Sequence, residues 1–118
     1  MTRPLQITFR HMQVHADLEA AIRERAADLE TYAPGIIGCG VTVEVPHRDR
    51  KHGRHLHVRV EAGLPGEDVI VSHESLQAHA LAAVHEAFDI TRRRLQDRTG
   101  VERDARRGRR SVAREAAR

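Results

Sequence analysis

Arginine is the residue type whose number and clustering could do chemistry in this chain. The sequence has 20 lysines and arginines, and Lys51 is the only lysine. A guanidinium group stays charged at physiological pH and presents its N–H donors in a planar fork that matches two phosphate oxygens. The cations gather in the segment HRDRKHGR at 47–54, in the run 92–94, and from Arg98 to the end. Phosphate binding is one chemistry that these residues indicate, although a GC-rich genome would equally favour arginine over lysine.

Nine histidines raise metal binding as an alternative chemistry. The set closest in sequence is His47, His52, His55 and His57, but neither a cysteine pair nor an HExxH spacing accompanies it. A zinc site needs three or four ligands that converge in space. We therefore expect neither a metal site nor another cofactor.

The segment 72–75, Ser-His-Glu-Ser, contains residue types found in hydrolase triads. Neighbours in sequence do not build a triad, because its nucleophile and base must converge in space. Ser75 is better explained as the N-cap of a helix that begins near Leu76. We expect no enzymatic activity.

The composition limits the class of protein. A chain of 118 residues forms one domain with a modest core, and its aromatic fraction of 3% is too low for a surface of rings on which bases stack. Cys39 is the only cysteine and alternates with Val41 and Val43, so we expect a buried, unpaired thiol. No apolar run is long enough to span a bilayer and no signal-peptide core is present, so we expect a cytoplasmic protein without membrane contact.

The first third of the chain changes from the period of a strand to that of a helix. Leu5, Ile7 and Phe9 alternate with polar residues, which predicts a half-buried strand that ends near His11. From residue 15 or 16, apolar residues recur every three or four positions and predict a helix that ends at Pro34-Gly35. Its predicted buried stripe consists of Leu18, Ile22, Ala26, Leu29 and Ala33.

Three strands are predicted next. The range 36–46 places Cys39, Val41, Val43 and Val45 on one face, and the charged segment 47–54 predicts a loop. The range 55–62 alternates again, and the turn at 64–68 leads to a short strand at 69–71.

The longest amphipathic pattern runs from Ser75 to about Arg98 and predicts a helix. Arg93 falls about opposite the apolar stripe, while Arg94 and Arg98 share one flank of it. An arginine-rich helix end also complements the helix dipole, so these cations alone do not specify a function. The predicted buried stripe consists of Leu81, Val84, Phe88, Thr91 and Leu95.

These elements predict an α+β fold with the order β-α-β-β-β-α. A crossover helix favours a parallel first pair of strands, and short links favour an antiparallel meander, which gives a four-stranded mixed sheet with both helices on one face. Residues 1–98 would form the domain. Thr99-Gly100 breaks the helical pattern, and the segment from Arg98 onward has eight arginines against three acids. Residues 99–118 are therefore predicted to be a mobile basic tail that is helical in part.

The order and spacing of several strings resemble the ribosome hibernation promoting factor family, also called ribosome-associated inhibitors or sigma-factor modulation proteins. The resemblance covers residues 5–98 and is carried by ITFRHMQV, LEAAIRERAADLE, VTVEVPHR with DRKHGR, HVRVEAGLPG, and AAVHEAFDITRRRLQD. The chain resembles the short form of the family, because 118 residues leave no room for the second domain with which long members join two ribosomes.

The resemblance implies a double-stranded-RNA-binding-like fold that binds ribosomal RNA of the small ribosomal subunit. Such a protein silences the ribosome by occupying the channel of messenger and transfer RNA, without chemistry. Family members present basic residues from both helices, although Asp28 and Thr31 stand where many of them have lysine. By position, Arg25 in the first helix and Arg92, Arg93 and Arg94 in the second match such sites.

The cations of the loop and the end of the second helix complete the expected RNA-binding set. Two alternatives stay open: a solvated hairpin tip would account for the charge of the loop, and a protein-interaction module that docks to an acidic regulatory partner would carry the same charge. The sequence also leaves open a homodimer and a role in joining ribosomes. The predicted RNA-binding residues are Arg25, Arg48, Arg50, Lys51, Arg54, Arg92, Arg93, Arg94 and Arg98.

Overall fold

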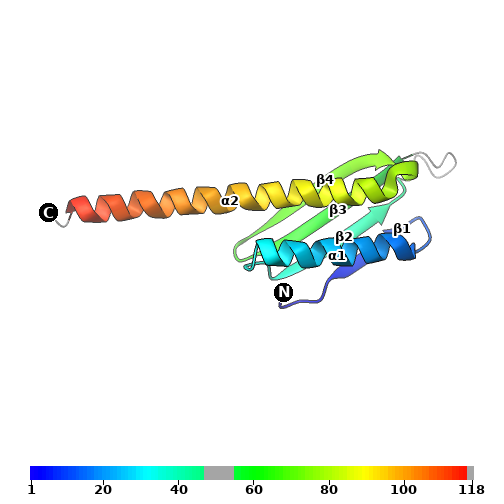
Figure 1. The fold of residues 1–118 in the computed structure, drawn as a ribbon, viewed down its shortest axis with the longest axis horizontal. Helices are drawn as coiled ribbons and strands as arrows, with labels where there is room; N and C mark the ends of the chain where they lie inside the picture. Colours follow the sequence, from blue (N-terminus) through cyan, green and yellow to red (C-terminus); the bar gives the residue numbers. More distant parts are fainter. Residues whose placement is uncertain (47–54, 117–118) are drawn as a thin grey trace.

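The computed structural model describes residues 1–46 and 55–116, and it describes side chains for residues 1–46 and 55–98. The chain order is one strand, one helix, three strands, a short 3₁₀ helix and a second helix (Figure 1). The elements are β1 (Gln6–Arg10), α1 (Ala16–Tyr32), β2 (Gly38–Glu44), β3 (His55–Leu64), β4 (Glu67–Leu76), η2 (Gln77–His79) and α2 (Ala80–Ala116).

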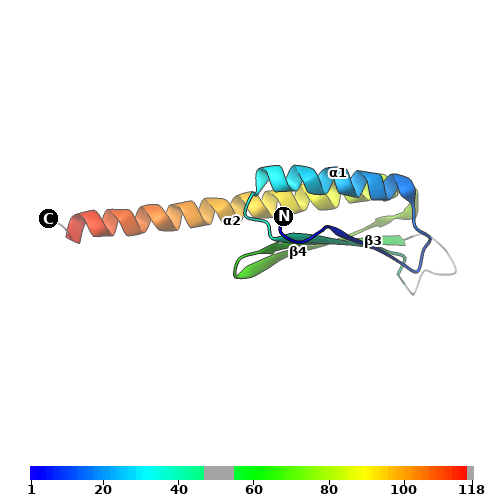
Figure 2. The same ribbon diagram turned by 90° about the horizontal axis from the view of Figure 1, so that it is seen from below.

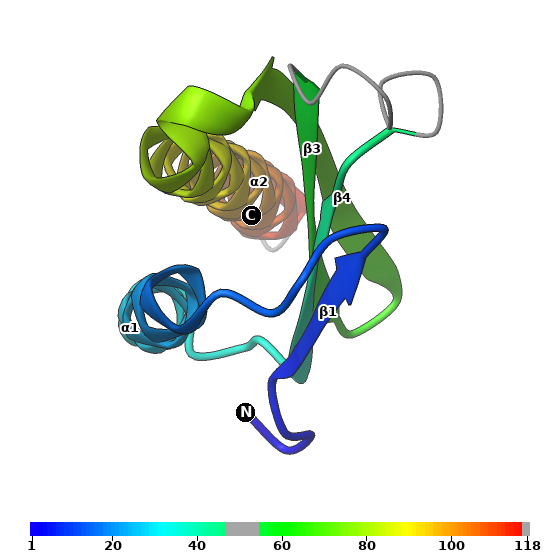
Figure 3. The ribbon, with the colours of Figure 1, turned by 90° about the vertical axis from the view of Figure 1, so that its right-hand side faces the viewer.

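The strands form one mixed sheet in the order β1-β2-β3-β4. β1 pairs in parallel with β2, because α1 carries the chain back to the end of the sheet at which β1 begins. β2, β3 and β4 pair in antiparallel fashion. Both helices pack on the same face of this sheet and leave the other face open (Figure 3). The predicted fold class and element order are therefore confirmed.

The core lies between the helices and the sheet. Alternation along β2 and β3 turns valines toward the helices, and Phe88 of α2 is the largest fully buried side chain. Thr91, the buried polar residue of α2, donates its hydroxyl to the Ala87 carbonyl at 2.8 Å, so its polar group is satisfied within the helix. Burial of Cys39 raises the pKa of its thiol to about 11, because the charged thiolate is disfavoured away from water.

The start of the second helix differs from the sequence prediction. Ser75 is not an N-cap: it lies in β4, paired with Leu56 of β3, since the β3–β4 ladder continues to Leu76. The helix proper begins at Ala80. Leu81 therefore sits in the first turn, where its side chain is 50% exposed instead of buried as predicted.

The end of the second helix also differs. α2 does not stop at Thr99-Gly100 but continues to Ala116, and it projects beyond the sheet (Figure 2). A glycine inside a helix costs about 1 kcal/mol relative to alanine, which a long run of helix formers on both sides tolerates. The molecule is consequently elongated, with extents of 70 × 26 × 20 Å. The predicted mobility of residues 99–118 stays a prediction.

Strand β1 ends where the sequence places its end. His11 has a positive φ of 59°, and the chain turns there toward α1. α1 begins at Ala16 and ends at Tyr32, directly before Ala33 and the Pro34-Gly35 pair. Its acidic first turn, with Asp17 and Glu19, complements the helix dipole.

Candidate nucleic-acid interface

The predicted RNA-binding cations divide into two groups by position. Arg25 lies on α1, and Arg92, Arg93, Arg94 and Arg98 lie on α2, which packs beside α1 on the same face of the sheet (Figure 1). The cations of the predicted loop fall outside the described residues, so their place stays a prediction. These are Arg48, Arg50, Lys51 and Arg54.

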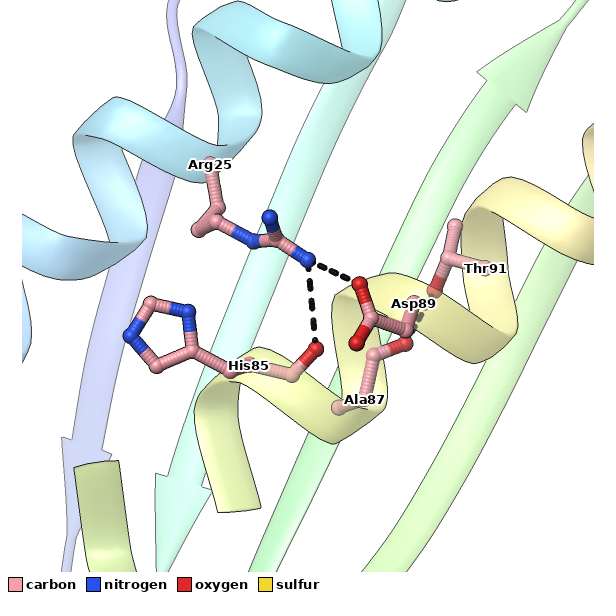
Figure 4. Close-up of polar contacts among 5 residues, drawn as sticks. All are labelled: Arg25, His85, Ala87, Asp89 and Thr91. Atoms are coloured by element: carbon pink, nitrogen blue, oxygen red, sulfur yellow. Dashed lines mark hydrogen bonds and ion pairs between the residues drawn. The ribbon is translucent and has the colours of Figure 1, made fainter. Parts of the chain in front are cut away.

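Arg25 is held against α2 by two acceptors (Figure 4). Its Nη2 donates to the Asp89 carboxylate, with which it forms an ion pair, and lies 3.4 Å from the His85 carbonyl oxygen. The Arg25 side chain is only 23% exposed, and its Nε has no hydrogen-bond partner among the described residues. The Nη2 contacts therefore fix the guanidinium in place against α2.

Arg92 is held by a different contact. Its guanidinium carbon lies 3.5 Å from the centroid of the Tyr32 ring, at the end of α1. Stacking of a guanidinium on an aromatic face is worth about 0.5–1 kcal/mol at an exposed site, and it leaves the N–H donors at the edge of the cation available. Tyr32 is 52% exposed, so this stacked pair lies at the surface.

A cavity of about 300 Å³ lies between α1 and α2, and the two fixed arginines are among the residues that line it. Phe88 and Leu29 contribute apolar wall, while Asp28 adds a carboxylate. Two guanidinium groups held from two helices can bind one phosphate with little further loss of side-chain freedom. The carboxylates of Asp28 and Asp89 reduce the net positive charge here. A phosphate would therefore be repelled near the carboxylates and attracted only where it meets the N–H donors of the guanidinium groups.

Arg94 and Arg98 make contacts that the sequence did not indicate. Arg94 Nη1 donates to the Ile70 carbonyl at 2.8 Å, and Arg98 Nη1 donates to the Glu67 carbonyl at 3.3 Å and lies 3.7 Å from the Glu67 carboxylate. β4 is an edge strand, whose outer backbone groups would otherwise invite pairing with another chain. Both arginines therefore cover this edge and join α2 to the sheet.

Arg93 differs from its two neighbours. It is exposed, and it has no hydrogen bond or ion pair among the described residues. This agrees with its predicted position opposite the buried stripe. Of the cations on α2 whose side chains are described, it is the one whose charge is most available to an external phosphate.

The partners of the arginines are the residues that sequence reasoning missed. Asp89 lies 64 residues from Arg25, so no local pattern connects the two. Tyr32 carried a weak signal, since it is the only tyrosine and stands at the last position of α1. An exposed aromatic residue at a helix end is an available stacking partner for an arginine.

The histidines do not assemble into a metal site in the part of the chain that is described. No three histidine, cysteine, aspartate or glutamate side chains converge there. His57 of β3 lies on the open face of the sheet, opposite Glu44 of β2. The Nε2 atom of His73 lies 2.7 Å from the Glu86 carboxylate of α2. Two of the predicted cluster, His47 and His52, fall outside the described residues. No helix among the described residues is long and apolar enough to cross a membrane.

The fold and this helical layer define a small α+β protein that holds arginines of both helices on one side of its sheet. The model of the Sigma 54 modulation protein / S30EA ribosomal protein family matches residues 5–100. The chain belongs to this family, which is a family of ribosome-associated factors. A comparison with curated proteins finds no match.

Solved structures share the fold at low sequence identity. A ribosomal subunit interface protein from Coxiella burnetii superposes with a TM-score of 0.68 at 12% identity, over 81% of this chain and 97% of that one. The N-terminal domain of Thermus thermophilus Protein Y gives a TM-score of 0.62 at 18% identity, over 78% of this chain and 93% of that one. The β-α-β-β-β-α architecture is therefore that of ribosomal subunit interface proteins.

Proposed function

We propose that this chain is a cytoplasmic ribosome hibernation factor that binds ribosomal RNA of the small subunit and occludes the channel of messenger and transfer RNA. Membership of the family supports a ribosome partner. The observation that carries the finer proposal is the pair of fixed guanidinium groups, Arg25 and Arg92, on either side of the cavity between the helices. Together with the exposed Arg93, this pair gives a short cationic surface on the helical layer.

The proposed mechanism is occupation rather than chemistry. Each phosphate that an arginine neutralises releases condensed counterions, which favours binding at low salt. Because Asp89 and Tyr32 already hold two of the guanidinium groups, less side-chain entropy is lost when RNA binds. In this proposal the folded chain, with extents of 70 × 26 × 20 Å, occupies a channel that RNA otherwise fills.

The contributions of the predicted cations are expected to differ. Arg25, Arg92 and Arg93 form the proposed primary contacts, and Arg94 and Arg98 contribute less because they also donate to backbone carbonyls of β4. The cations of the predicted loop follow one another closely in sequence and add phosphate contacts in this proposal. They are Arg48, Arg50, Lys51 and Arg54.

The test is co-sedimentation of the full chain with purified small subunits at increasing salt, together with translation in a purified system. We expect binding that weakens steeply with salt and translation that falls as the chain is added. The double variant Arg92→Gln/Arg93→Gln should bind more weakly and with a smaller salt slope. Arg23→Gln is the matched control, because Arg23 is an exposed arginine of α1 whose partner is Glu19 and which does not line the cavity between the helices.

Two results would contradict the proposal. Translation that continues undiminished with the chain in large excess would exclude silencing by occlusion. Association that survives ribonuclease treatment would instead indicate a protein partner of acidic character, which is the alternative that the sequence leaves open.

A further inference from the structure

A second cavity lies on the opposite face of the sheet from the arginines of the helical layer. It has a volume of about 390 Å³ and lies where β1 and β2 begin and where the β3–β4 hairpin turns. Figure 3 shows that no helix covers this face. The polar residues among those that line it are Arg3, Gln6, Glu61 and Asp68, and the proposed RNA contacts on the helices use none of them.

The floor of this cavity consists partly of glycine. Gly38 pairs with Gly63 across β2 and β3, and Gly40 is the next residue of β2 on the same face. A Cβ at Gly38 would meet the Arg3 side chain at 3.3 Å, which explains that glycine by the close approach of the N-terminal segment. A Cβ at Gly40 would meet nothing within 4 Å, and one at Gly63 would make only ordinary contacts of 3.6 Å or more.

Gly40 and Gly63 therefore lack a reason within the described fold. Neither has a positive φ, so the backbone conformation does not require glycine at either position. A glycine inside a strand weakens the sheet, and it often marks a place where a ligand or another chain approaches the backbone closely. Of these two, Gly63 lines the cavity and Gly40 does not, so a flat group that lies on the peptide planes within the cavity would account for Gly63.

The walls of the cavity carry opposite charges. Arg3 stands on one side, and Glu61 and Asp68 stand on the other, with Glu61 oriented by an ion pair to Arg59 at 2.8 Å. Among the described residues, Arg3 and Asp68 do not pair with each other or with another charge. A ligand that satisfies both walls must present a negative group to Arg3 and hydrogen-bond donors to the carboxylates.

From these observations we propose that the cavity binds a guanylate group, either as a free nucleotide or as a residue of RNA. The guanine ring lies on the glycine floor, its N1–H and N2–H groups donate to Asp68 and Glu61, and its phosphate binds Arg3. An arginine or lysine side chain of a peptide would also donate to the carboxylates, but it would place a like charge beside Arg3. A free amino acid has both charges but lacks a flat ring to cover the floor.

The proposal concerns a site separate from the helical arginines, so it can fail or hold independently of the proposed function. The experiment is a titration of the full ¹⁵N-labelled chain with GMP, followed by the amide signals of Gly38 and Gly63, which line the cavity. We expect saturable shifts with a dissociation constant on the order of 1 mM. AMP should bind roughly tenfold more weakly, because its ring edge offers a different donor pattern.

Variants separate the parts of the site. Asp68→Asn should weaken GMP by roughly tenfold, and Arg3→Gln should weaken GMP while leaving guanosine, which lacks the phosphate, unchanged. Gly63→Val should abolish binding by filling the floor, and Asp68→Asn provides the test if that variant fails to fold. Gly35→Ala is the control, because a Cβ there meets nothing within 4 Å and Gly35 does not line the cavity.

Further titrations distinguish a free nucleotide from a residue of RNA and define the results that would overturn the proposal. Shifts with the pentanucleotide AAGAA but not with AAAAA assign the group to RNA, and shifts with GMP alone assign it to the free nucleotide. Absence of shifts at Gly38 and Gly63 with every nucleotide up to about 10 mM overturns the proposal. Equal shifts with inorganic phosphate, or shifts with N-acetyl-arginine amide in place of GMP, overturn it as well.

Discussion

Substitution of two adjacent arginines of α2 by glutamine should lower the stability of the fold at one position and weaken ribosome binding at the other. Arg94→Gln removes the donor to the Ile70 carbonyl at 2.8 Å, whereas Arg93→Gln removes a side chain that has no hydrogen bond or ion pair within the described part of the chain. Both changes remove one positive charge at neighbouring positions of the same helix. The pair therefore separates the structural use of an arginine from its use as a phosphate ligand.

The structure sets the size of each effect. One hydrogen bond contributes about 0.5–1.5 kcal/mol net, and the exposure of Arg94 places its bond at the lower end. A domain of roughly 100 residues loses about 4–8 °C of Tm for each kcal/mol, so Arg94→Gln should lower Tm by a few degrees. Arg93→Gln should change the free energy of unfolding by less than about 0.5 kcal/mol.

Urea unfolding measures the stability difference, and co-sedimentation with small subunits at several salt concentrations measures binding. Arg93→Gln should reduce the slope of log K against log salt by about 1, while Arg94→Gln should change it by clearly less. Equal stability of the two variants, together with an equal loss of salt slope, would refute the reasoning. It would mean that Arg94 leaves the β4 carbonyl to bind RNA.

Three further predictions concern the core and the contact between the helices. Phe88→Ala should destabilise the fold by about 3–5 kcal/mol in urea unfolding, because the ring is 1% exposed and leaves a cavity between α2 and the sheet. Tyr32→Leu should cost less than about 1 kcal/mol of stability but weaken ribosome binding, because Arg92 loses the ring that orients it; unchanged binding would remove Tyr32 from the site. Cys39 should react with a thiol reagent at pH 8 only after unfolding. Burial raises the pKa of this thiol from 9.0 to about 11, so the stability that the neutral thiol contributes is fully present below pH 9 and is lost as the pH rises toward 11. Urea unfolding of the natural chain and of Cys39→Ala, at a pH below 9 and at a pH near 11, measures this loss.

The elements were predictable from the sequence because their signals are local. Alternation in 36–46 and 55–62 identified β2 and β3, and the three- and four-residue spacing of Leu18, Ile22 and Ala26 identified α1. A right-handed crossover and short links then left few arrangements of four strands. The architecture follows from these rules without long-range information.

The ends of α2 were not predictable in this way, because two local preferences compete there. Ser75 is a good N-cap by residue type, but the same residue continues a ladder in which β3 and β4 pair over ten residues each. The ladder satisfies backbone groups along its whole length, and a cap satisfies one or two. Gly100 is likewise a helix breaker by type, yet a single glycine does not outweigh the helix on either side of it.

The candidate site shows why a count of cations overestimates an RNA interface. The family resemblance predicts Arg94 as an RNA ligand, and Arg98 joins it at the end of the same basic segment. The flank of the buried stripe that these two residues share brings them beside the exposed edge of β4. An arginine beside this edge donates hydrogen bonds to a backbone carbonyl of β4, while its positive charge still attracts an anion at longer range. Arg25 and Arg92 also have internal partners, but these partners fix the guanidinium groups at the surface of the cavity between the helices. Whether an internal contact withdraws an arginine from RNA or positions it for RNA thus depends on where the remaining N–H donors point, which only the packing of α1 against α2 decides.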